Sequence, residues 1–273
     1  HLIESSKPNP FTPPMFCMLL RKHLLGGRIV DIIQPGFDRI AEIIVENINE
    51  MGDLAYKRLI IEIMGRHSNI ILVDDACRII DSIKHVNETI SSVRQVLPGK
   101  SYESPPSQGK RNPLEQTQQS LASLFKEAPL NKKAEGVIAE SFTGVSRATA
   151  TEIVYRALRD DSLTIQNIDT EKLTALYSSF IGFFEDVSKG QFYPAMLIND
   201  DGNPRDIFPF IYTIYPERMQ RHYSSVSEML EMFYSERDKN ERMKQRSSHI
   251  LKVIKTNMER CQKKLAIQLE ELQ

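Results

Sequence analysis

Five residues, Gly65-Arg66-His67-Ser68-Asn69, separate two largely apolar segments of β type at 59–64 and 70–73. A hairpin needs only Asn-Gly or Asp-Gly to turn, yet this insert carries a guanidinium, an imidazole, a hydroxyl and an amide. Such groups bind the phosphate and sugar oxygens of nucleic acids. The alternative is a polar turn whose side chains cap their own backbone. The residue types alone leave both interpretations open.

A second candidate site is the pair Asp38-Arg39, which follows Pro35-Gly36 and precedes a β-type segment. Adjacent residues of a strand face opposite ways, so one of the two side chains could point into a groove at the strand entrance. The alternative is a turn carboxylate beside a surface arginine. A third cluster, Arg21-Lys22-His23, ends an expected helix, where it either complements the helix dipole or contacts an RNA backbone.

The patterns that accompany catalysis are missing from the sequence. The six histidines form no H-x-x-x-H pair or compact metal-ligand cluster. Gly99-Lys100-Ser101 lacks the first glycine of a phosphate-binding loop, since that position is Arg94. No Gly-x-Ser-x-Gly elbow occurs. We therefore expect no catalytic residues, no metal and no cofactor, and a protein that is not an enzyme.

Composition limits the class of protein. With 273 residues and a net charge of −1, the chain is no uniformly basic nucleic-acid coat, so any polyanion site must be local. Three scattered cysteines argue against a disulfide framework and fit a reducing cytoplasm. No apolar run approaches the roughly 18–20 residues of a membrane span. The start at His1 lacks an initiator Met and a signal-peptide core, so we expect a chain that begins within a longer protein.

The candidate residues need a framework, and residues 1–115 predict a β-rich domain. A short helix is expected over 14–25, between Pro13-Pro14 and Gly26-Gly27. Antiparallel β-type segments follow, as a meander or sandwich, and residues 97–115, with four prolines, are typical of a linker. The predicted strands are 28–33, 39–45, 58–64, 69–73 and 78–83.

Residues 116–190 change to helical periodicity. The segment 142–150 has a helix-hairpin-helix-like pattern, in which Gly144 permits a tight turn and Ser146 caps the next helix. Backbone N–H groups at such a helix start can hold a phosphate. The alternative is an ordinary αα-hairpin. The predicted buried face consists of Ile138, Phe142, Val145, Ala148, Ile153, Val154, Ala157 and Leu158.

The remaining chain predicts a β-hairpin and a long helix. The hairpin lies within 191–222 around Asp200–Asn203, and we expect it to rejoin the first sheet. Over 223–273, apolar residues from Leu251 to Leu272 recur at steps of three and four, the pattern of one coiled-coil helix. Residues 237–264 carry ten Lys or Arg against three Asp or Glu. This excess is either a solvated face or a surface for a polyanion.

Four segments in order give the chain a family resemblance: 13–23, 34–40, 59–74 and 96–102. Together they resemble the signature of the NFACT family, to which RqcH and NEMF proteins belong and whose bacterial members were called fibronectin-binding proteins. The resemblance implies an α+β fold: an antiparallel domain like the N-terminal domain of formamidopyrimidine-DNA glycosylases, an inserted helical module and a coiled-coil arm. It also implies that an upstream piece of the first domain is missing. Because no return helix follows the last helix, we expect the arm to be one strand of a coiled-coil hairpin that can pair with another copy.

By the same resemblance, the chain is part of a ribosome-associated quality-control factor. Such a factor binds an obstructed large ribosomal subunit with its peptidyl-tRNA and recruits alanyl-tRNA for template-free C-terminal alanine tailing. The resemblance assigns tRNA binding to Asp38, Arg39, Glu62, Ile63, Met64, Arg66, His67, Ser68 and Asn69. We expect contacts with the RNA backbone from Arg21, Lys22, Gly144, Ser146, Arg147, Lys244 and Arg246.

Two other functions compete with this interpretation. The family's historical name suggests a fibronectin-binding surface adhesin, although no signal, anchor or membrane span is visible. The glycosylase-like scaffold suggests a DNA-repair relative. The chain offers no zinc-finger cysteines for that chemistry, and its first residue cannot serve as the N-terminal nucleophile that those enzymes use.

Overall fold

The computed structural model describes residues 9–48, 52–106 and 109–271, except for the side chains of Arg246, His249, Ile250 and Glu270. The described chain divides into two compact units, one that ends at Ser188 and one that starts at Lys189. The first unit holds a five-stranded sheet and a helical module, and the second holds a small sheet and a long helix. The predicted α+β class with antiparallel sheets is confirmed.

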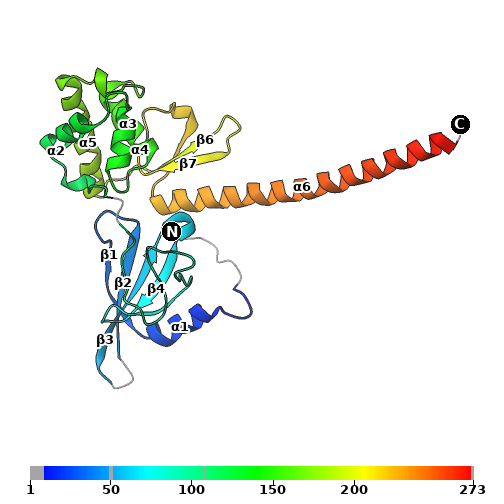
Figure 1. The fold of residues 1–273 in the computed structure, drawn as a ribbon, viewed down its shortest axis with the longest axis horizontal. Helices are drawn as coiled ribbons and strands as arrows, with labels where there is room; N and C mark the ends of the chain where they lie inside the picture. Colours follow the sequence, from blue (N-terminus) through cyan, green and yellow to red (C-terminus); the bar gives the residue numbers. More distant parts are fainter. Residues whose placement is uncertain (1–8, 49–51, 107–108, 272–273) are drawn as a thin grey trace. The chain divides into compact units, whose positions relative to one another are not determined.

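The first unit begins with the predicted helix, α1 (Met15–Leu24), which buries Phe16. Gly27 follows it, and a Cβ atom there would lie 2.6 Å from Val45 Cγ1, so only glycine fits. Five antiparallel strands then run in chain order across one sheet, so of the two predicted arrangements, meander and sandwich, the structure has the meander (Figure 1). They are β1 (Arg28–Ile33), β2 (Ile40–Ile48), β3 (Leu54–Glu62), β4 (Asn69–Val73) and β5 (Ile79–Ser82).

One face of this sheet forms the core. The register pairs Ile40 with Glu62, Glu62 with Asn69, and Ile60 with Ile71, so these side chains share a face. Ile40, Ile60 and Ile71 pack with Val73, Ile79 and Val96 in one buried cluster. Two carboxylates and an amide, of Glu42, Glu62 and Asn69, are buried on the same face. Buried polar groups of this kind need partners. Arg58 pairs with Glu42, while Arg94 and Lys84, the partners of Glu62 and Asn69, line the candidate site.

The segment after β5 belongs to the sheet domain. Val86 and Val96 exchange backbone hydrogen bonds of 2.9 and 2.8 Å, and Tyr102 N–H donates to the Cys77 carbonyl at 2.8 Å. Val86, Val96 and Tyr102 all pack into the core cluster of the sheet. The expectation of a linker over 97–115 is therefore wrong at its start, because residues 97–102 are fixed against β5 and its turn.

The helical module contains α2 (Gln118–Glu127), α3 (Ala134–Ser141), α4 (Arg147–Leu158) and α5 (Thr170–Ser188). The predicted turn and cap are confirmed: Gly144 has a φ of +73°, and Ser146 Oγ accepts a hydrogen bond of 3.1 Å from Thr149 N–H at the start of α4. Five of the eight predicted core residues are buried, while Ala148, Ala157 and Leu158 are half-buried. The rings of Phe142, Phe180 and Phe184 pack in the core of the module, tilted by 48° and 49° from one ring to the next.

The second unit corrects one prediction. The hairpin forms, as β6 (Ala195–Ile198) and β7 (Pro204–Phe208), but it does not rejoin the first sheet. Instead β6 pairs on its other side with β8 (Gln220–His222) in a separate three-stranded sheet. The physical reason is local, because the Gln220 side chain donates to the Tyr212 and Tyr215 carbonyls and accepts from Tyr212 N–H. These bonds fold the chain back onto β6.

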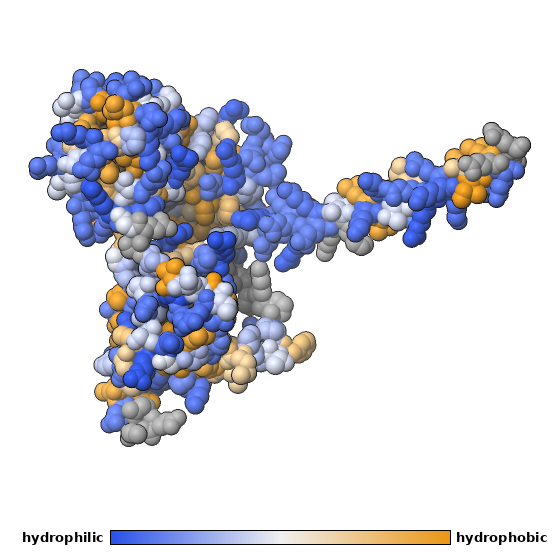
Figure 2. All heavy atoms as spheres, viewed as in Figure 1, coloured by the Kyte–Doolittle hydropathy of each residue, from blue (hydrophilic) through white to orange (hydrophobic). Residues whose placement is uncertain are grey.

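The predicted long helix is α6 (Val226–Glu271). Its first turns pack Met229 and Phe233 against Met196 of β6. Apolar side chains interrupt the hydrophilic surface of its C-terminal half (Figure 2), and Leu251, Ile254, Met258 and Leu265 are each about half exposed. The coiled-coil partner that this seam predicts stays a prediction, as does the likeness to glycosylases. Within the described residues, no helix has both the length and the apolar character to cross a bilayer.

Candidate functional site

Two adjoining hollows in the first unit bring most of the predicted residues together. The larger has a volume of about 830 Å³ and the smaller about 370 Å³. They share Arg39, Met64, Pro105 and Pro106, so we treat them as one groove. The larger hollow contains the predicted residues Arg39, Glu62, Met64, Arg66, His67, Ser68 and Asn69, and the smaller contains Asp38, Arg39, Met64, Gly144 and Ser146.

Arg39 lies where the two hollows meet, immediately before β2. Its backbone is fixed, because its carbonyl accepts a hydrogen bond of 2.8 Å from Ile63 N–H. The Asp38 carboxylate accepts the Arg39 N–H at 2.7 Å, and Gln34 Nε2 donates to the Asp38 carbonyl at 2.6 Å. Among the described residues, nothing pairs with the exposed Arg39 guanidinium. A fixed backbone with an unpaired guanidinium suits the capture of an anionic ligand.

The insert 65–69 combines both interpretations of its sequence. It forms a short 3-10 turn, Gly65–His67, in which Ser68 Oγ accepts a hydrogen bond of 2.9 Å from Met64 N–H. Ser68 therefore caps its own backbone, as the alternative proposed. Arg66 and His67 are exposed, and Arg66 Nε donates to His67 Nε2 at 2.9 Å. The turn thus presents a guanidinium and an imidazole at the groove. Ile63 is 59% exposed and lines neither hollow.

Asn69 positions a lysine that the sequence analysis missed. Its Nδ2 donates to the Lys84 carbonyl at 2.9 Å, and its Oδ1 accepts from Lys84 N–H at 3.0 Å. This buried amide fixes the backbone of Lys84, whose Nζ in turn donates to the Arg66 carbonyl at 3.3 Å. Lys84 and His85 both line the larger hollow. No spacing rule links Asn69 to residue 84, so the contact was not predictable from the sequence.

Glu62 is held by two further residues that were missed. Its carboxylate accepts hydrogen bonds from Arg94 at 2.6 and 3.0 Å and from the Tyr102 hydroxyl at 3.0 Å. Burial, together with the Glu62 carboxylate, raises the pKa of Tyr102 above its ordinary value. Glu62 is only 2% exposed, so its charge is neutralised inside the groove wall. The one available signal was a glutamate within an apolar strand, which implies a buried cation.

The helical side of the smaller hollow adds the start of α4. Gly144 and Ser146 line it beside Lys110, whose Nζ donates to the Ala139 carbonyl at 3.0 Å. The groove as a whole is lined by five Lys or Arg (39, 66, 84, 94, 110) and two Asp or Glu (38, 62), a formal charge of +3 in a chain of −1. This concentration of positive charge marks the groove as a site for an anion or a polyanion.

The comparison with protein families agrees with the motifs. A family model described as NFACT N-terminal and middle domains matches residues 1–273. The chain belongs to the NFACT family. The chain superposes on the N-terminal part of the fibronectin/fibrinogen-binding protein of Streptococcus suis with a TM-score of 0.66 and 32% sequence identity. The superposition covers 85% of this chain and 77% of that chain. The fibrinogen binding protein of Staphylococcus aureus superposes with a TM-score of 0.65 and 31% sequence identity, over 82% of this chain and 76% of that chain.

Curated NFACT relatives include two bacterial proteins named Rqc2 homolog RqcH. The one from Bacillus subtilis (strain 168) is 36% identical over 253 residues, which are 92% of this chain and 41% of the relative. The one from Streptococcus suis (strain 05ZYH33) is 32% identical over 272 residues, which are 99% and 44% of the two chains. The NFACT chain described here therefore spans less than half the length of these relatives.

Three of the other predicted RNA contacts of this NFACT chain, Arg21, Lys22 and Arg147, do not line the groove. Arg21 and Lys22 are exposed on the last turns of α1, and neither lines a hollow. Arg147 lies 3.6 Å from Glu135 in an ion pair, so part of its charge is compensated. Lys244 is exposed on α6 in the second unit, and the Arg246 side chain lies outside the described part of the structure.

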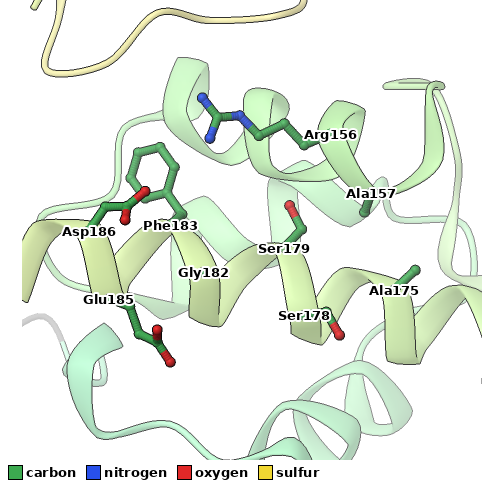
Figure 3. A pocket seen from close by; sticks show the side chains of 9 residues that line it. All are labelled: Arg156, Ala157, Ala175, Ser178, Ser179, Gly182, Phe183, Glu185 and Asp186. Atoms are coloured by element: carbon green, nitrogen blue, oxygen red, sulfur yellow. The ribbon is translucent and has the colours of Figure 1, made fainter. Parts of the chain in front are cut away.

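A third hollow of the NFACT chain, about 620 Å³, lies between α4 and α5 (Figure 3). Two of its polar side chains are engaged: Arg156 pairs with Glu152 at 2.6 Å, and Ser179 Oγ donates to the Ile153 carbonyl at 2.8 Å. We assign no ligand to it. In the described part of the chain, no three His, Cys, Asp or Glu residues gather in an arrangement that could bind a metal ion.

Proposed function

We propose that the groove binds tRNA and that the chain is part of an Rqc2-like factor in ribosome-associated quality control. The observation that carries this proposal is the convergence of Asp38-Arg39, the 65–69 turn and the start of α4 on one groove of formal charge +3. The relatives named Rqc2 homolog RqcH support the assignment to this class of factor.

Each side of the groove has a distinct task in the proposal. The Arg39 guanidinium, which has no partner among the described residues, and the exposed Arg66 and Lys84 bind phosphates of one strand. The Asp38 carboxylate, which keeps one oxygen outside its bond to Arg39 N–H, accepts from a base or a ribose hydroxyl. Glu62 and Asn69 act behind the surface, by fixing Arg94 and Lys84.

The finer steps of the proposal follow the family resemblance. The factor binds a large ribosomal subunit that carries an obstructed peptidyl-tRNA, and it recruits alanyl-tRNA for template-free alanine tailing. The ribosome transfers the peptide, so the chain is not the catalyst. The basic segment of α6 contacts ribosomal RNA, and the apolar seam from Leu251 to Leu265 pairs with another helix as a coiled coil.

The test is sequencing of the RNA that co-purifies with the full-length protein from its host. The variant is Asp38→Ala/Arg39→Ala. The matched control is Arg205→Ala/Asp206→Ala. That pair is also adjacent, its arginine is exposed like Arg39, and Asp206 likewise accepts its neighbour's N–H, at 2.9 Å. The proposal expects large-subunit rRNA and alanine tRNA with the wild type and the control, and loss of the tRNA with the variant. Equal tRNA recovery from all three proteins would refute it.

The names of the solved relatives favour a second candidate, the binding of fibronectin or fibrinogen. Immobilised fibronectin and fibrinogen, probed with the full-length protein, test it. Saturable binding that survives nuclease treatment would support this candidate. Retention that disappears with the nucleic acid would reject it.

A further inference from the structure

Phe37 directly precedes the Asp38-Arg39 pair in the sequence, but its side chain packs elsewhere. It follows Gly36 in the turn between β1 and β2, and its half-buried ring lies against the helical module. The ring centroid is 6.0 Å from that of Phe184 of α5, at an interplanar angle of 79°. Such edge-to-face pairs are a favourable aromatic geometry. The turn that presents Arg39 is therefore connected to a helix more than 140 residues away in the sequence.

The second contact of Phe37 is Gly144. A Cβ atom at Gly144 would lie 2.7 Å from two carbons of the Phe37 ring and 3.2 Å from its carbonyl oxygen. The Phe37 ring thus occupies the space that any other side chain would take. Gly144 also has a φ of +73°, so glycine is required there for two independent reasons. Ser146, two residues on, caps α4 and lines the smaller hollow.

These contacts place Phe37 between the two sides of the smaller hollow. Asp38 and Arg39 form one side, and Gly144 and Ser146 form the other. The Ile63–Arg39 hydrogen bond ties the turn to the residue that follows β3, and the Gln34–Asp38 hydrogen bond lies within the turn. The Phe37 ring connects the same turn to the helical module.

We propose that Phe37, packed on Gly144 and Phe184, is a positioning residue that aligns the Asp38-Arg39 turn with the start of α4, so that one tRNA strand contacts both sides at once. This inference rests on the proposed tRNA-binding function. Phe37 itself touches no RNA. Replacement of Phe37 should disturb the alignment of the two sides without removing a charge from the groove.

The experiment compares variants of the full-length protein in tRNA binding and in amide hydrogen exchange. Phe37→Ala removes the ring, and Gly144→Ala pushes it away. Gly99→Ala is the matched control, because Gly99 has a similar φ of +81° but nothing within 4 Å of an added Cβ. Circular dichroism at the assay temperature establishes that each variant is folded.

We expect Phe37→Ala and Gly144→Ala to lower the affinity for tRNA about tenfold, a difference of roughly 1.4 kcal/mol, while Gly99→Ala retains it. Peptides covering 34–39 and 142–146 should exchange faster together in both variants. Combining Gly144→Ala with Phe37→Leu should restore part of the affinity, since the smaller side chain leaves room for the methyl group. Lys110→Ala alone should weaken tRNA binding. Added to Phe37→Ala, it should cause little further loss of affinity, because the helical side is then already out of alignment.

Wild-type affinity in a folded Phe37→Ala variant, while Asp38→Ala/Arg39→Ala loses binding, would overturn this inference and leave the proposed function intact. Fully additive effects of Phe37→Ala and Lys110→Ala would also overturn it. Absence of tRNA binding by the wild type would overturn the proposed function and, with it, the alignment of a tRNA strand. The exchange rates would then report separately whether Phe37 joins the two segments.

Discussion

The Arg94 guanidinium donates two hydrogen bonds, of 2.6 and 3.0 Å, to the Glu62 carboxylate, and both side chains are nearly buried. The pair lies in the wall of the groove, beside Arg39 and Asn69. Arg94 also lies over the ring of Tyr102, 5.1 Å from its centroid, and Tyr102 bonds to the same carboxylate. The stability that this cluster contributes can be measured apart from any RNA.

Breaking the Arg94–Glu62 pair should strongly destabilise the fold. Arg94→Met leaves the Glu62 carboxylate buried without a cation, which costs about 3–5 kcal/mol of unfolding free energy. Chemical denaturation of the wild type and the variant measures the loss. The matched control is Arg28→Met, since Arg28 pairs with Glu46 at 2.9 Å but is 74% exposed. Its effect should be far smaller, and equal losses in the two variants would contradict the account.

Tyr102 should make stability depend on alkaline pH. Because burial and the Glu62 charge raise the pKa of the folded hydroxyl, the folded state keeps its proton at a pH where the unfolded state has lost it. The stabilisation is therefore present in full at a pH below the tyrosine pKa of the unfolded state, about 10. It declines as the pH rises toward the pKa of the folded state. Denaturation midpoints between pH 8 and 11.5 should fall more steeply for the wild type than for Tyr102→Phe. Parallel curves would contradict the prediction.

Asn69→Asp should weaken the fold although the two side chains have the same shape. A carboxylate can still accept from Lys84 N–H, but it cannot donate to the Lys84 carbonyl, and it brings a buried charge. We expect a loss of about 1–3 kcal/mol in unfolding free energy and faster amide exchange at residues 82–86. The control Asn87→Asp changes an exposed amide in the same segment. An Asn69→Asp variant as stable as that control would count against the positioning role of Asn69.

The apolar seam of α6 should mediate association. Leu265→Asp places a charge in the seam, where Leu265 is 57% exposed and therefore contributes little to the folded unit. Sedimentation equilibrium should show that concentration-dependent association is lost, while the melting temperature of the rest of the chain is unchanged. Gln262→Asp, one turn away and off the seam, should keep the association. Identical behaviour of the two variants would argue against a coiled coil.

The sequence predicted the local features of the site and missed those that depend on distant contacts. The strands of the first sheet, the Gly144 turn and the Ser146 cap follow from hydrophobic alternation and from glycine and serine chemistry, which act over a few residues. Motif resemblance located Asp38-Arg39 and the 65–69 insert. Neither kind of signal reveals that Lys84 is held by Asn69, or Arg94 by Glu62.

The wrong predictions have the same origin. The prolines of 97–115 suggested a linker, yet Val96 and Tyr102 are packed into the sheet core, and that packing overrides composition. The hairpin at β6–β7 was expected to extend the first sheet, but the nearby β8 supplies a partner strand at lower entropic cost. The assignment of Glu62 and Asn69 to tRNA contact, which the family motif suggests, stays a prediction. Both side chains are buried and hydrogen-bonded within the protein, so we expect them to support the groove from behind.

The most direct test of the tRNA-binding groove is the affinity of the full-length protein for alanyl-tRNA, measured by fluorescence titration over a series of salt concentrations. Arg39→Ala removes a guanidinium that has no partner in the described structure, so the melting temperature should not change. A charge-assisted contact of about 1.5–3 kcal/mol predicts a loss of affinity of roughly 10- to 100-fold, with a shallower salt dependence. The control Arg205→Ala should bind like the wild type. Wild-type affinity and salt dependence in folded Arg39→Ala would contradict the central claim.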